Sequence, residues 1–381
     1  MQTDTQPKLT PAQQNIIART NLLQTGIPMV RKLATVNSEI GQKIDIPLER
    51  MGIMTGVLLH FKTTITEATA AAVNSKLAPW NLVQNISYRD FSGLERLFAS
   101  GYGLYALQCL KRNELIGFSR YQTLEQIYGT FTNVGDINTN IVYMPTAIGS
   151  APLEFSLYVP FAYDPSSDLT GAILTQTATG QHFITVQFAN ALVNSDESLA
   201  PFKSTAGTIT DNGISVTPYQ FYIQPQDLSI NNLPLIDLQT VYGIEGNFKS
   251  TQNIAVSQDC YINYPNNRAV LGALFQFENG NSFTLNETDI GNVTLLANSN
   301  THLRELDSRV IREMMREICG GDLASGTYYM PHRRNPILTQ LYANVQAVFN
   351  VVGPLDTGTT QFIYHYEVQY PSGSPLPGIV V

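Results

Sequence analysis

The stretch Leu233-Pro-Leu-Ile-Asp-Leu-Gln-Thr-Val-Tyr-Gly-Ile-Glu-Gly246 divides this sequence into two halves. Each half is a series of short segments in which apolar and polar residues alternate, as in β-strands with one buried face. The stretch is apolar enough to be buried, but Pro234, Gly243 and Gly246 are expected to interrupt any long helix or central strand. We therefore predict a packed connector between two β domains, in which the apolar run comprises Leu233, Pro234, Leu235, Ile236, Asp237 and Leu238.

The length of 381 residues is compatible with two domains, since a single core seldom grows so large. Charged residues make up 14% of the chain, against about 25% in typical soluble proteins. A surface poor in charge suits large protein contacts, whose buried centres contain few Lys, Glu and Asp. A secreted β protein with few charges is the alternative. The predicted segments are an arm (1–43), a first domain (44–232), the connector (233–247) and a second domain (248–381).

The net charge of −8 argues against binding nucleic acid through a broad basic surface. The N-terminal arm is nevertheless basic. Thr10, Pro11 and Gln13 have the spacing of a helix start with a capping box, and Gly26 is the expected end of that helix. Such an arm either docks on its own domain or lies against a partner or an anionic membrane. Two acidic residues in the arm oppose five basic ones, a net +3: Lys8, Arg19, Arg31, Lys32 and Lys43.

The three cysteines are far apart and include no C-x-x-C pair, so they predict neither a disulfide framework nor a zinc site. We interpret Cys109, Cys260 and Cys319 as small buried apolar residues. The N-terminus does not have the charged start and apolar core of a signal peptide, and no window reaches the ~18 apolar residues of a membrane span. These observations favour folding in a cytoplasm.

Period-two alternation predicts most of the regular structure. Two helical regions are expected as well: a short one or two within 92–111, and a longer one from Leu303 to Cys319 with an apolar stripe of Leu303, Leu306, Val310, Met314 and Ile318. The expected strands lie at 57–61, 155–159, 184–188, 219–223, 271–277, 283–285, 341–351 and 362–370. We expect the seventh and eighth of these to pair antiparallel, and 271–277 to form a hairpin with 283–285.

Short strands separated by turns, with few helices and no alternation of strand and helix, favour an all-β fold. Two such blocks around one connector predict a pair of β-sandwiches or jelly rolls.

Motifs of known chemistry are few. Gly101-x-Gly103-x-x-Ala106 matches a relaxed dinucleotide fingerprint, but no βαβ unit surrounds it. Asp164 and Asp168 flank a turn and could contribute to a Ca²⁺ site, although capping of that turn is the simpler role. Asp237 and Glu245 could form a glycosidase pair, but their apolar surroundings show no cleft.

The five histidines occur singly and are interpreted as structural: His60, His182, His302, His332 and His365. The basic cluster His332-Arg333-Arg334 between two prolines is interpreted as a solvated loop or an interface contact. The sequence therefore predicts no catalytic residues, cofactor or metal, and no enzyme activity.

Several segments resemble, in order along nearly the whole chain, the major capsid protein of tectiviruses, the membrane-containing bacterial viruses. The resemblance is weaker in residues 92–150 and 286–302. The segments that carry it are Leu9-Thr-Pro-Ala-Gln-Gln14, Asn81-Leu-Val-Gln84, Asp168-Leu-Thr-Gly-Ala172, Phe188-Ala-Asn190, Leu233-Pro-Leu-Ile-Asp-Leu238, Gly280-Asn-Ser-Phe283 and Gly326-Thr-Tyr-Tyr329.

The resemblance implies two vertical eight-stranded jelly rolls side by side, and a homotrimer whose pseudo-hexagonal outline tiles an icosahedral shell. It also implies that the N-terminal helix faces an internal viral membrane, and that the partners are further copies, minor capsid proteins and penton proteins. On this view the protein is a structural part of the virion capsid, made in a bacterial cytoplasm, with no sequence-specific nucleic acid binding. The alternatives from composition are a lectin-like carbohydrate-binding protein and, less favoured, a β-sandwich glycosidase.

Overall fold

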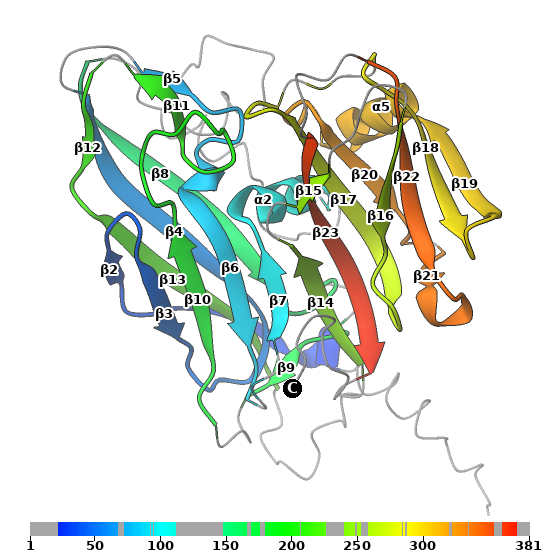
Figure 1. Ribbon diagram of the computed structural model, residues 1–381. Helices are drawn as coiled ribbons and strands as arrows, with labels where there is room; N and C mark the ends of the chain where they lie inside the picture. The colour runs from blue at the N-terminus through cyan, green and yellow to red at the C-terminus, as the bar shows by residue number, and fades with distance from the viewer. Residues whose placement is uncertain are drawn as a thin grey trace, which may run out of the picture.

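Alternation along the chain produces antiparallel strands that pack face to face in two β-sandwiches, which lie side by side (Figure 1). The structure is a computed structural model. It describes residues 22–67, 72–91, 93, 95–111, 148–165, 169–175, 180–205, 207–225, 240–247, 250–252, 258–283, 285, 288–319, 322–333, 335–353 and 360–371.

One face of the first sandwich is a sheet built around the 15-residue strand β4 (Ile53–Glu67). β4 pairs antiparallel with β8 along twelve residues and with β13 on its other side. Among the described residues this sheet has seven strands, and its other members are β1 (Ile27–Lys32), β2 (Val36–Ser38), β8 (Gly149–Pro160), β9 (Ile173–Leu174), β12 (Ile209–Asp211) and β13 (Ile214–Gln224).

A second sheet continues through both sandwiches, in the order β20-β17-β23-β14-β7-β6-β10-β3. β15 and β21 pair at its side, and β5 (Ala72–Asn74) and β11 (Phe202–Thr205) form a separate small sheet. The strands of the shared sheet are β3 (Lys43–Pro47), β6 (Val83–Arg89), β7 (Glu95–Ala99), β10 (Phe183–Phe188), β14 (Thr240–Gly246), β15 (Ser250–Gln252), β17 (Ala269–Asn279), β20 (Thr327–Pro331), β21 (Ile337–Leu338) and β23 (Thr360–Pro371).

The second sandwich is closed by a sheet with the order β16-β22-β18-β19. Aromatic rings connect the facing sheets in both cores. Phe61 of β4 meets Phe188 of β10 edge to face at 6.1 Å, and Phe349 of β22 meets Phe277 of β17 at 4.6 Å. The closing strands are β16 (Asp259–Asn263), β18 (Ile290–Ala297), β19 (Thr301–Asp307) and β22 (Val345–Val351).

Two α-helices are described in full. Helix α2 (Gly101–Leu110) is apolar on all sides and buried on nearly all of them, and it begins with Ser100 as N-cap. Helix α5 (Ser308–Cys319) is amphipathic and packs against β20 and α2. Short 3₁₀ turns occur at η1 (Trp80–Leu82) and η3 (Thr339–Leu341). In the described part of the chain, no helix combines the length and apolarity needed to cross a membrane.

The strands predicted at 57–61, 155–159, 184–188 and 219–223 are confirmed in β4, β8, β10 and β13. The predicted pairing of 341–351 with 362–370 is wrong. Both segments contain strands, but β22 pairs with β16 and β18, whereas β23 lies in the facing sheet. Alternation identifies the face that a strand buries, but it does not identify the neighbouring strand.

The helix predicted from Leu303 begins five residues later, because the preceding residues form β19 and pair with β18. The predicted stripe is also displaced by one position. Val310 is 47% exposed, while Ile311, Met315 and Cys319 are buried. The predicted hairpin after 271–277 has its turn at Gly280, but the buried residues Phe283 and Leu285 belong to no named strand.

Three boundaries also differ from expectation. Residues 27–43, predicted within the helical arm, form β1, β2 and the first residue of β3, and only the turn 22–25 before Gly26 is helical among the described arm residues. Region 92–111 contains β7 as well as a helix. Residues 240–246 of the connector form the central strand β14, so the expectation that Gly243 and Gly246 interrupt such a strand is wrong. Residues 1–21 and 226–239 lie outside the described residues.

Candidate functional site: the interface between the sandwiches

The two sandwiches meet where β7 of the first runs parallel to β14 of the second, with Leu97 opposite Ile244 and Phe98 opposite Glu245. Glycine on β14 makes this approach possible. A Cβ on Gly243 would lie 2.3 Å from the Arg96 carbonyl oxygen, and one on Gly246 would lie 2.7 Å from that of Phe98. Any larger residue would push the two strands apart.

Helix α2 fills the space beside this strand pair. A Cβ on Gly103 would lie 2.2 Å from the His365 ring on β23, so the helix can approach the second sandwich only with glycine at this position. The Tyr102 hydroxyl accepts a hydrogen bond from the Ala324 backbone N–H at 2.8 Å. The chain's one tryptophan, Trp80, stacks on Tyr105 of the helix at 3.5 Å between ring centroids. Contacts to both sandwiches therefore hold α2.

His365 is completely buried and is bound by the first turn of α2. The Ser100 backbone N–H donates to Nε2 of His365 at 3.0 Å, so that nitrogen carries a lone pair and the proton of the neutral ring is on Nδ1. The Ser100 hydroxyl lies 3.2 Å from the same Nε2 and also accepts from the Gly103 N–H. Burial lowers the pKa of His365 to about 3, so the ring is neutral at physiological pH.

Glu367, two residues further along β23, is the centre of a buried charged cluster. Its carboxylate accepts from Lys111 at 2.5 Å and from the hydroxyls of Tyr242 and Tyr329 at 2.8 and 3.1 Å. Arg333 lies 3.8 Å away. Burial alone would raise the pKa of the Glu367 carboxyl, but the charges of Lys111 and Arg333 hold it below its ordinary value. Lys111 follows α2, so this ion pair connects the two sandwiches.

A second ion pair lies close to the same strand junction. Arg268 donates from Nε to Glu245 of β14 at 2.6 Å, and its guanidinium lies 4.3 Å from the centre of the Tyr370 ring. Burial raises the pKa of the Glu245 carboxyl, and the charge of Arg268 opposes that shift. Pairing of this kind is what allows a carboxylate to remain beside the sheet junction.

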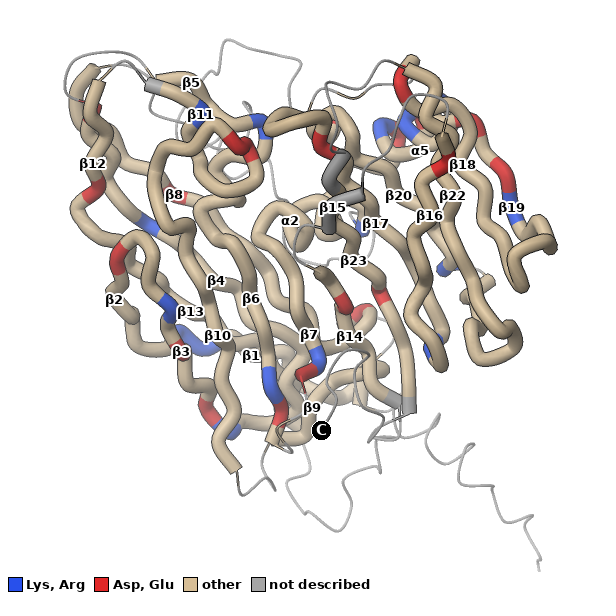
Figure 2. The backbone as a smooth tube through the Cα atoms, in the orientation of Figure 1, with Lys and Arg blue, Asp and Glu red and all other residues tan. Residues whose placement is uncertain are grey.

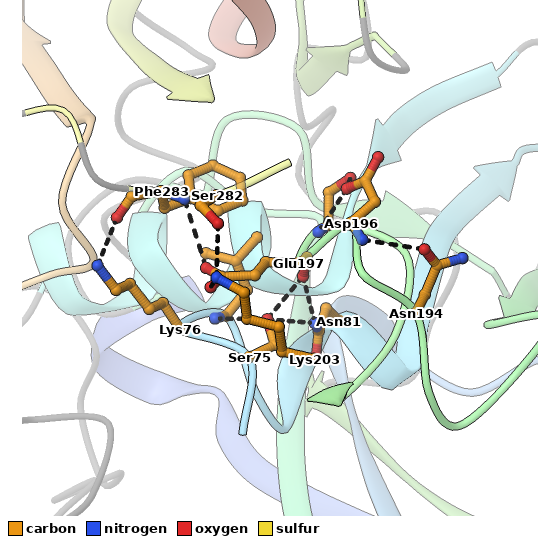
Figure 3. A network of polar contacts seen from close by, with 11 residues as sticks. Ser75, Lys76, Asn81, Asn194, Asp196, Glu197, Lys203, Ser282 and Phe283 are labelled. Carbon is orange, nitrogen blue, oxygen red and sulfur yellow. Dashed lines mark hydrogen bonds and ion pairs between the residues drawn. The ribbon is translucent and has the colours of Figure 1, made fainter. Parts of the chain in front are cut away.

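A third polar cluster joins the sandwiches near β5 and β11 (Figure 3). Glu197 and Lys203 of the first sandwich form an ion pair at 2.9 Å, and Lys203 donates to the Ser282 hydroxyl of the second sandwich at 2.6 Å. Lys76 donates to the Phe283 carbonyl oxygen at 2.9 Å. Within the first sandwich, the Asn81 amide donates to the Glu197 and Ala200 carbonyl oxygens. The loop that carries Glu197 is therefore tied to the turn after β17.

The candidate residues from the sequence analysis do not come together in one site among the described residues. Arg31 and Lys32 lie on the exposed strand β1, which belongs to the seven-stranded sheet and not to the sheet that contains the β7–β14 junction. Glu245 pairs with Arg268. Gly101 and Gly103 are in the first turn of α2, against neighbouring backbone and side chains, and the described strands around them form no nucleotide-binding βαβ unit. His332 lies 3.0 Å from the Tyr264 hydroxyl and Arg333 lies 3.8 Å from Glu367, and both contacts are within the second sandwich. The remaining candidates lie outside the described residues: Lys8, Arg19, Asp168, Leu233, Pro234, Leu235, Ile236, Asp237, Leu238 and Arg334.

Other sequence interpretations concern burial and metal ligands. Cys109, Cys260 and Cys319 are buried and form no disulfide, as expected. His182 and His332 are buried and have their pKa lowered to about 4, first by burial, whereas His60 is only partly buried. Among the described residues, no group of three or more His, Cys, Asp or Glu is placed to hold a metal ion.

Sequence reasoning missed Ser100, Lys111, His365 and Glu367 as interface residues. The aromatic face of β23 was recognised, but nothing in the sequence placed His365 and Glu367, which alternate with it, against a helix. The one signal in the sequence is the run from Gly101 to Leu110, which contains no charged residue. An entirely apolar helix has to be covered on every side, and a sheet face is the natural cover.

Two family models match this chain. The P3 major capsid protein N-terminal model matches residues 12–225, and the P3 major capsid protein C-terminal model matches residues 239–369. The chain belongs to the P3 major capsid protein family. The "Major capsid protein P3" of Enterobacteria phage PRD1 is 28% identical over 366 residues, which cover 90% of this chain and 91% of that protein.

Solved viral capsid structures share the fold of this P3-family protein. A crystal structure of the STIV MCP has a TM-score of 0.63 at 16% identity, covering 92% of this chain and 98% of that chain. A quasi-atomic model of the PBCV-1 virus capsid has a TM-score of 0.60 at 11% identity, covering 91% and 94%. Together with the four sheets described above, these neighbours identify the fold as a double jelly roll.

The tectivirus resemblance is therefore confirmed, and the protein is a structural capsid protein of the virion that assembles into a capsid lattice. The carbohydrate-binding alternative has no support among these relatives. In this family member, the contacts between the sandwiches join the two jelly rolls of one chain.

The Lys111–Glu367 pair gives a first prediction. Lys111→Met removes the closest cation from a carboxylate that has no access to water, and we expect a loss of about 3–5 kcal/mol in the free energy of unfolding. Adding Glu367→Gln to that variant should recover part of the loss. Urea unfolding measures both. Lys62→Met is the control, since its pair with Glu154 is exposed and contributes no more than about 1 kcal/mol. Equal losses for the two lysine variants would contradict a structural role for the buried pair.

His365 gives a prediction about pH. Its folded-state pKa lies below its ordinary 6.5, so the unfolded chain takes up the proton first, and stability is full above pH 6.5 and falls as the pH is lowered. Between pH 7 and pH 5 this single group should cost about 2 kcal/mol. Glutamine at this position keeps a hydrogen-bond acceptor but does not titrate. Between pH 7 and pH 5, the free energy of unfolding of the His365→Gln variant should therefore fall by about 2 kcal/mol less than that of the unaltered protein. Identical pH profiles for the two proteins would show that His365 does not report on this contact.

Proposed function

We propose that this capsid protein forms homotrimers with a pseudo-hexagonal outline, and that these trimers tile an icosahedral shell over an internal membrane. The main support is that one ten-stranded sheet, counted over the described residues, runs through both sandwiches. Each chain therefore supplies two similar blocks in a fixed relation, and three chains supply six blocks around one axis. Six similar blocks approximate a hexagon without requiring six identical subunits.

The sparse charge supports extensive protein contacts. Only 14% of the residues are charged, and Figure 2 shows long stretches of strand without Lys, Arg, Asp or Glu. The division we propose is an N-terminal arm, a first jelly roll to residue 232, a connector at 233–247 and a second jelly roll at 248–381. To this we add that 27–43 belong with the first roll and β14 with the sheet of the second.

Further parts of the proposal follow from the tectivirus resemblance. The protein acts without catalysis and without a cofactor, and it does not recognise nucleic acid sequence. Minor capsid and penton proteins are its other partners in the shell. It folds in the cytoplasm of a bacterial host before assembly.

The described end of the arm supports contact with a membrane. All six residues of β1 are exposed, including Ile27, Met29 and Val30 at 47%, 42% and 55%, and the basic pair Arg31-Lys32 follows directly. Exposed apolar side chains beside cations suit an anionic lipid surface. Arg31 is also held by Glu49 at 2.8 Å, although both side chains remain about half exposed.

Light scattering of the purified protein tests the trimer. Because the building unit is a closed assembly, we expect a mass of three times the 42.1 kDa chain over a wide range of protein concentration. Negative-stain images should show particles with a hexagonal outline. A constant monomeric mass at all concentrations would contradict the proposal.

Vesicle flotation tests the membrane contact. Replacing Arg19, Arg31 and Lys32 by Ser should weaken binding to vesicles of anionic phospholipid by roughly 3 kcal/mol, about a hundredfold, and added salt should weaken binding of the unaltered protein. The control replaces the same number of exposed cations elsewhere: Lys62, Arg309 and Arg316. Equal weakening by both sets, or binding that salt does not affect, would remove the arm from the membrane contact.

A further inference from the structure

A cavity of about 780 Å³ lies in the second sandwich beside β19, and the capsid role described above does not use it. Its volume falls in the range of about 300–1,000 Å³ that is usual for small-molecule sites. Most of its wall is apolar and comes from separate elements, with Leu295 on β18, Leu303 on β19, and Met314 and Ile318 on α5. These three elements, β18, β19 and α5, pack against one another, so the apolar wall is already formed in the structure.

Arg304 of β19 lines the same cavity and is half-buried. Its Nη1 donates to the Pro331 carbonyl oxygen at 3.0 Å, a contact that holds the guanidinium at the cavity. Within the residues that the structure describes, no carboxylate forms an ion pair with Arg304. Arg268 and Arg316, in contrast, are neutralised by Glu245 and Asp322. Among the described residues, therefore, no carboxylate balances the positive charge of Arg304 by direct contact.

Further polar groups line the cavity beside Arg304. Arg333 is a second guanidinium in the wall and lies 3.8 Å from the Glu367 carboxylate. His332 is uncharged at neutral pH, because burial and the nearby charge of Arg304 lower its pKa to about 4. The nearest acidic neighbour in sequence, Glu305, is exposed and accepts from the Asn292 amide instead. The wall thus contains two guanidinium groups, the uncharged His332 and Asn335, and otherwise apolar side chains.

We propose that this cavity binds a single-chain amphiphile with a carboxylate head group, such as a fatty acid, with the head group at Arg304 and the chain between α5 and β18. A guanidinium binds a carboxylate through two parallel hydrogen bonds, and desolvated surroundings strengthen such bonds. A cationic amphiphile would be repelled by the arginines. A small polar anion would leave the apolar wall without a partner.

Calorimetric titration of the full-length protein with dodecanoate, below its micelle concentration and at pH 7.5, tests the proposal. We expect one molecule bound per chain, at least about tenfold more tightly than dodecyltrimethylammonium, which has the same chain with a cationic head, and acetate, which has the head without the chain. Arg304→Gln should weaken dodecanoate binding about tenfold or more. Arg309→Gln is the matched control on the exposed start of α5 and should leave binding unchanged.

Two results would overturn the proposal: equal affinity for the anionic and cationic amphiphiles, or unaltered dodecanoate binding by Arg304→Gln. If that variant does not fold, Met314→Glu places a carboxylate in the apolar wall and should abolish binding, and retained binding would equally overturn the proposal. Circular dichroism and thermal unfolding confirm the fold of each variant. The measurement does not depend on trimers or on a lattice, so its outcome is separate from that of the proposed function.

Discussion

The arrangement of both sandwiches depends on the close approach of β7 to β14. Without it, the ten strands would be two separate sheets, and the sandwiches would be connected only by side-chain contacts and the chain between them. The approach is possible because Gly243 and Gly246 present no side chain to the backbone of β7. Hydrogen bonds between strands fix distance and direction more tightly than side-chain packing does. A shared sheet therefore makes the angle between the two jelly rolls a property of the backbone.

The buried charges at this junction add specificity to that geometry. A carboxylate without water, such as Glu367, is tolerated only where Lys111 and the tyrosine hydroxyls meet it, so displaced arrangements of the sandwiches leave it unpaired. The same contacts make the junction sensitive to acid. His365 loses its stabilising contribution below pH 6.5, and Glu367, whose pKa is lowered, loses its contribution below the ordinary carboxyl range. Both effects act in the same direction, at the place where the two halves of the capsid protein meet.

Much of the fold could be predicted from local pattern. The strands that bury one face, such as β8 and β10, are evident from alternation, and the all-β class follows from them. The predictions that were wrong concern features that depend on residues far away in the sequence. The segment from Leu303 to Asp307 has apolar positions compatible with a helix, and only its pairing with β18 makes it a strand. Gly243 was interpreted as a strand breaker because its actual neighbour, the Arg96 carbonyl, is about 150 residues earlier in the chain.

The interface between the sandwiches could also be predicted only in part. Segments that carried the family resemblance are brought together there: Asn81 and Phe283 in the cluster around Glu197, and Tyr329 beside Glu367. Their importance could be recognised from the sequence, but their shared location could not. Lys111 and Glu367 carried no motif, because a buried ion pair consists of two single residues far apart in sequence. Such pairs become visible only when the sheet and the helix are placed in space.

The central claim is that the two jelly rolls are one rigid unit through β14, and hydrogen exchange of the backbone amides tests it most directly. Strand β14 should exchange only through opening of the whole protein, with the same free energy as the core strands β4 and β17. Exchange of residues 240–246 that is much faster than that of both cores would mean that the junction opens while each sandwich stays folded, and would contradict the account.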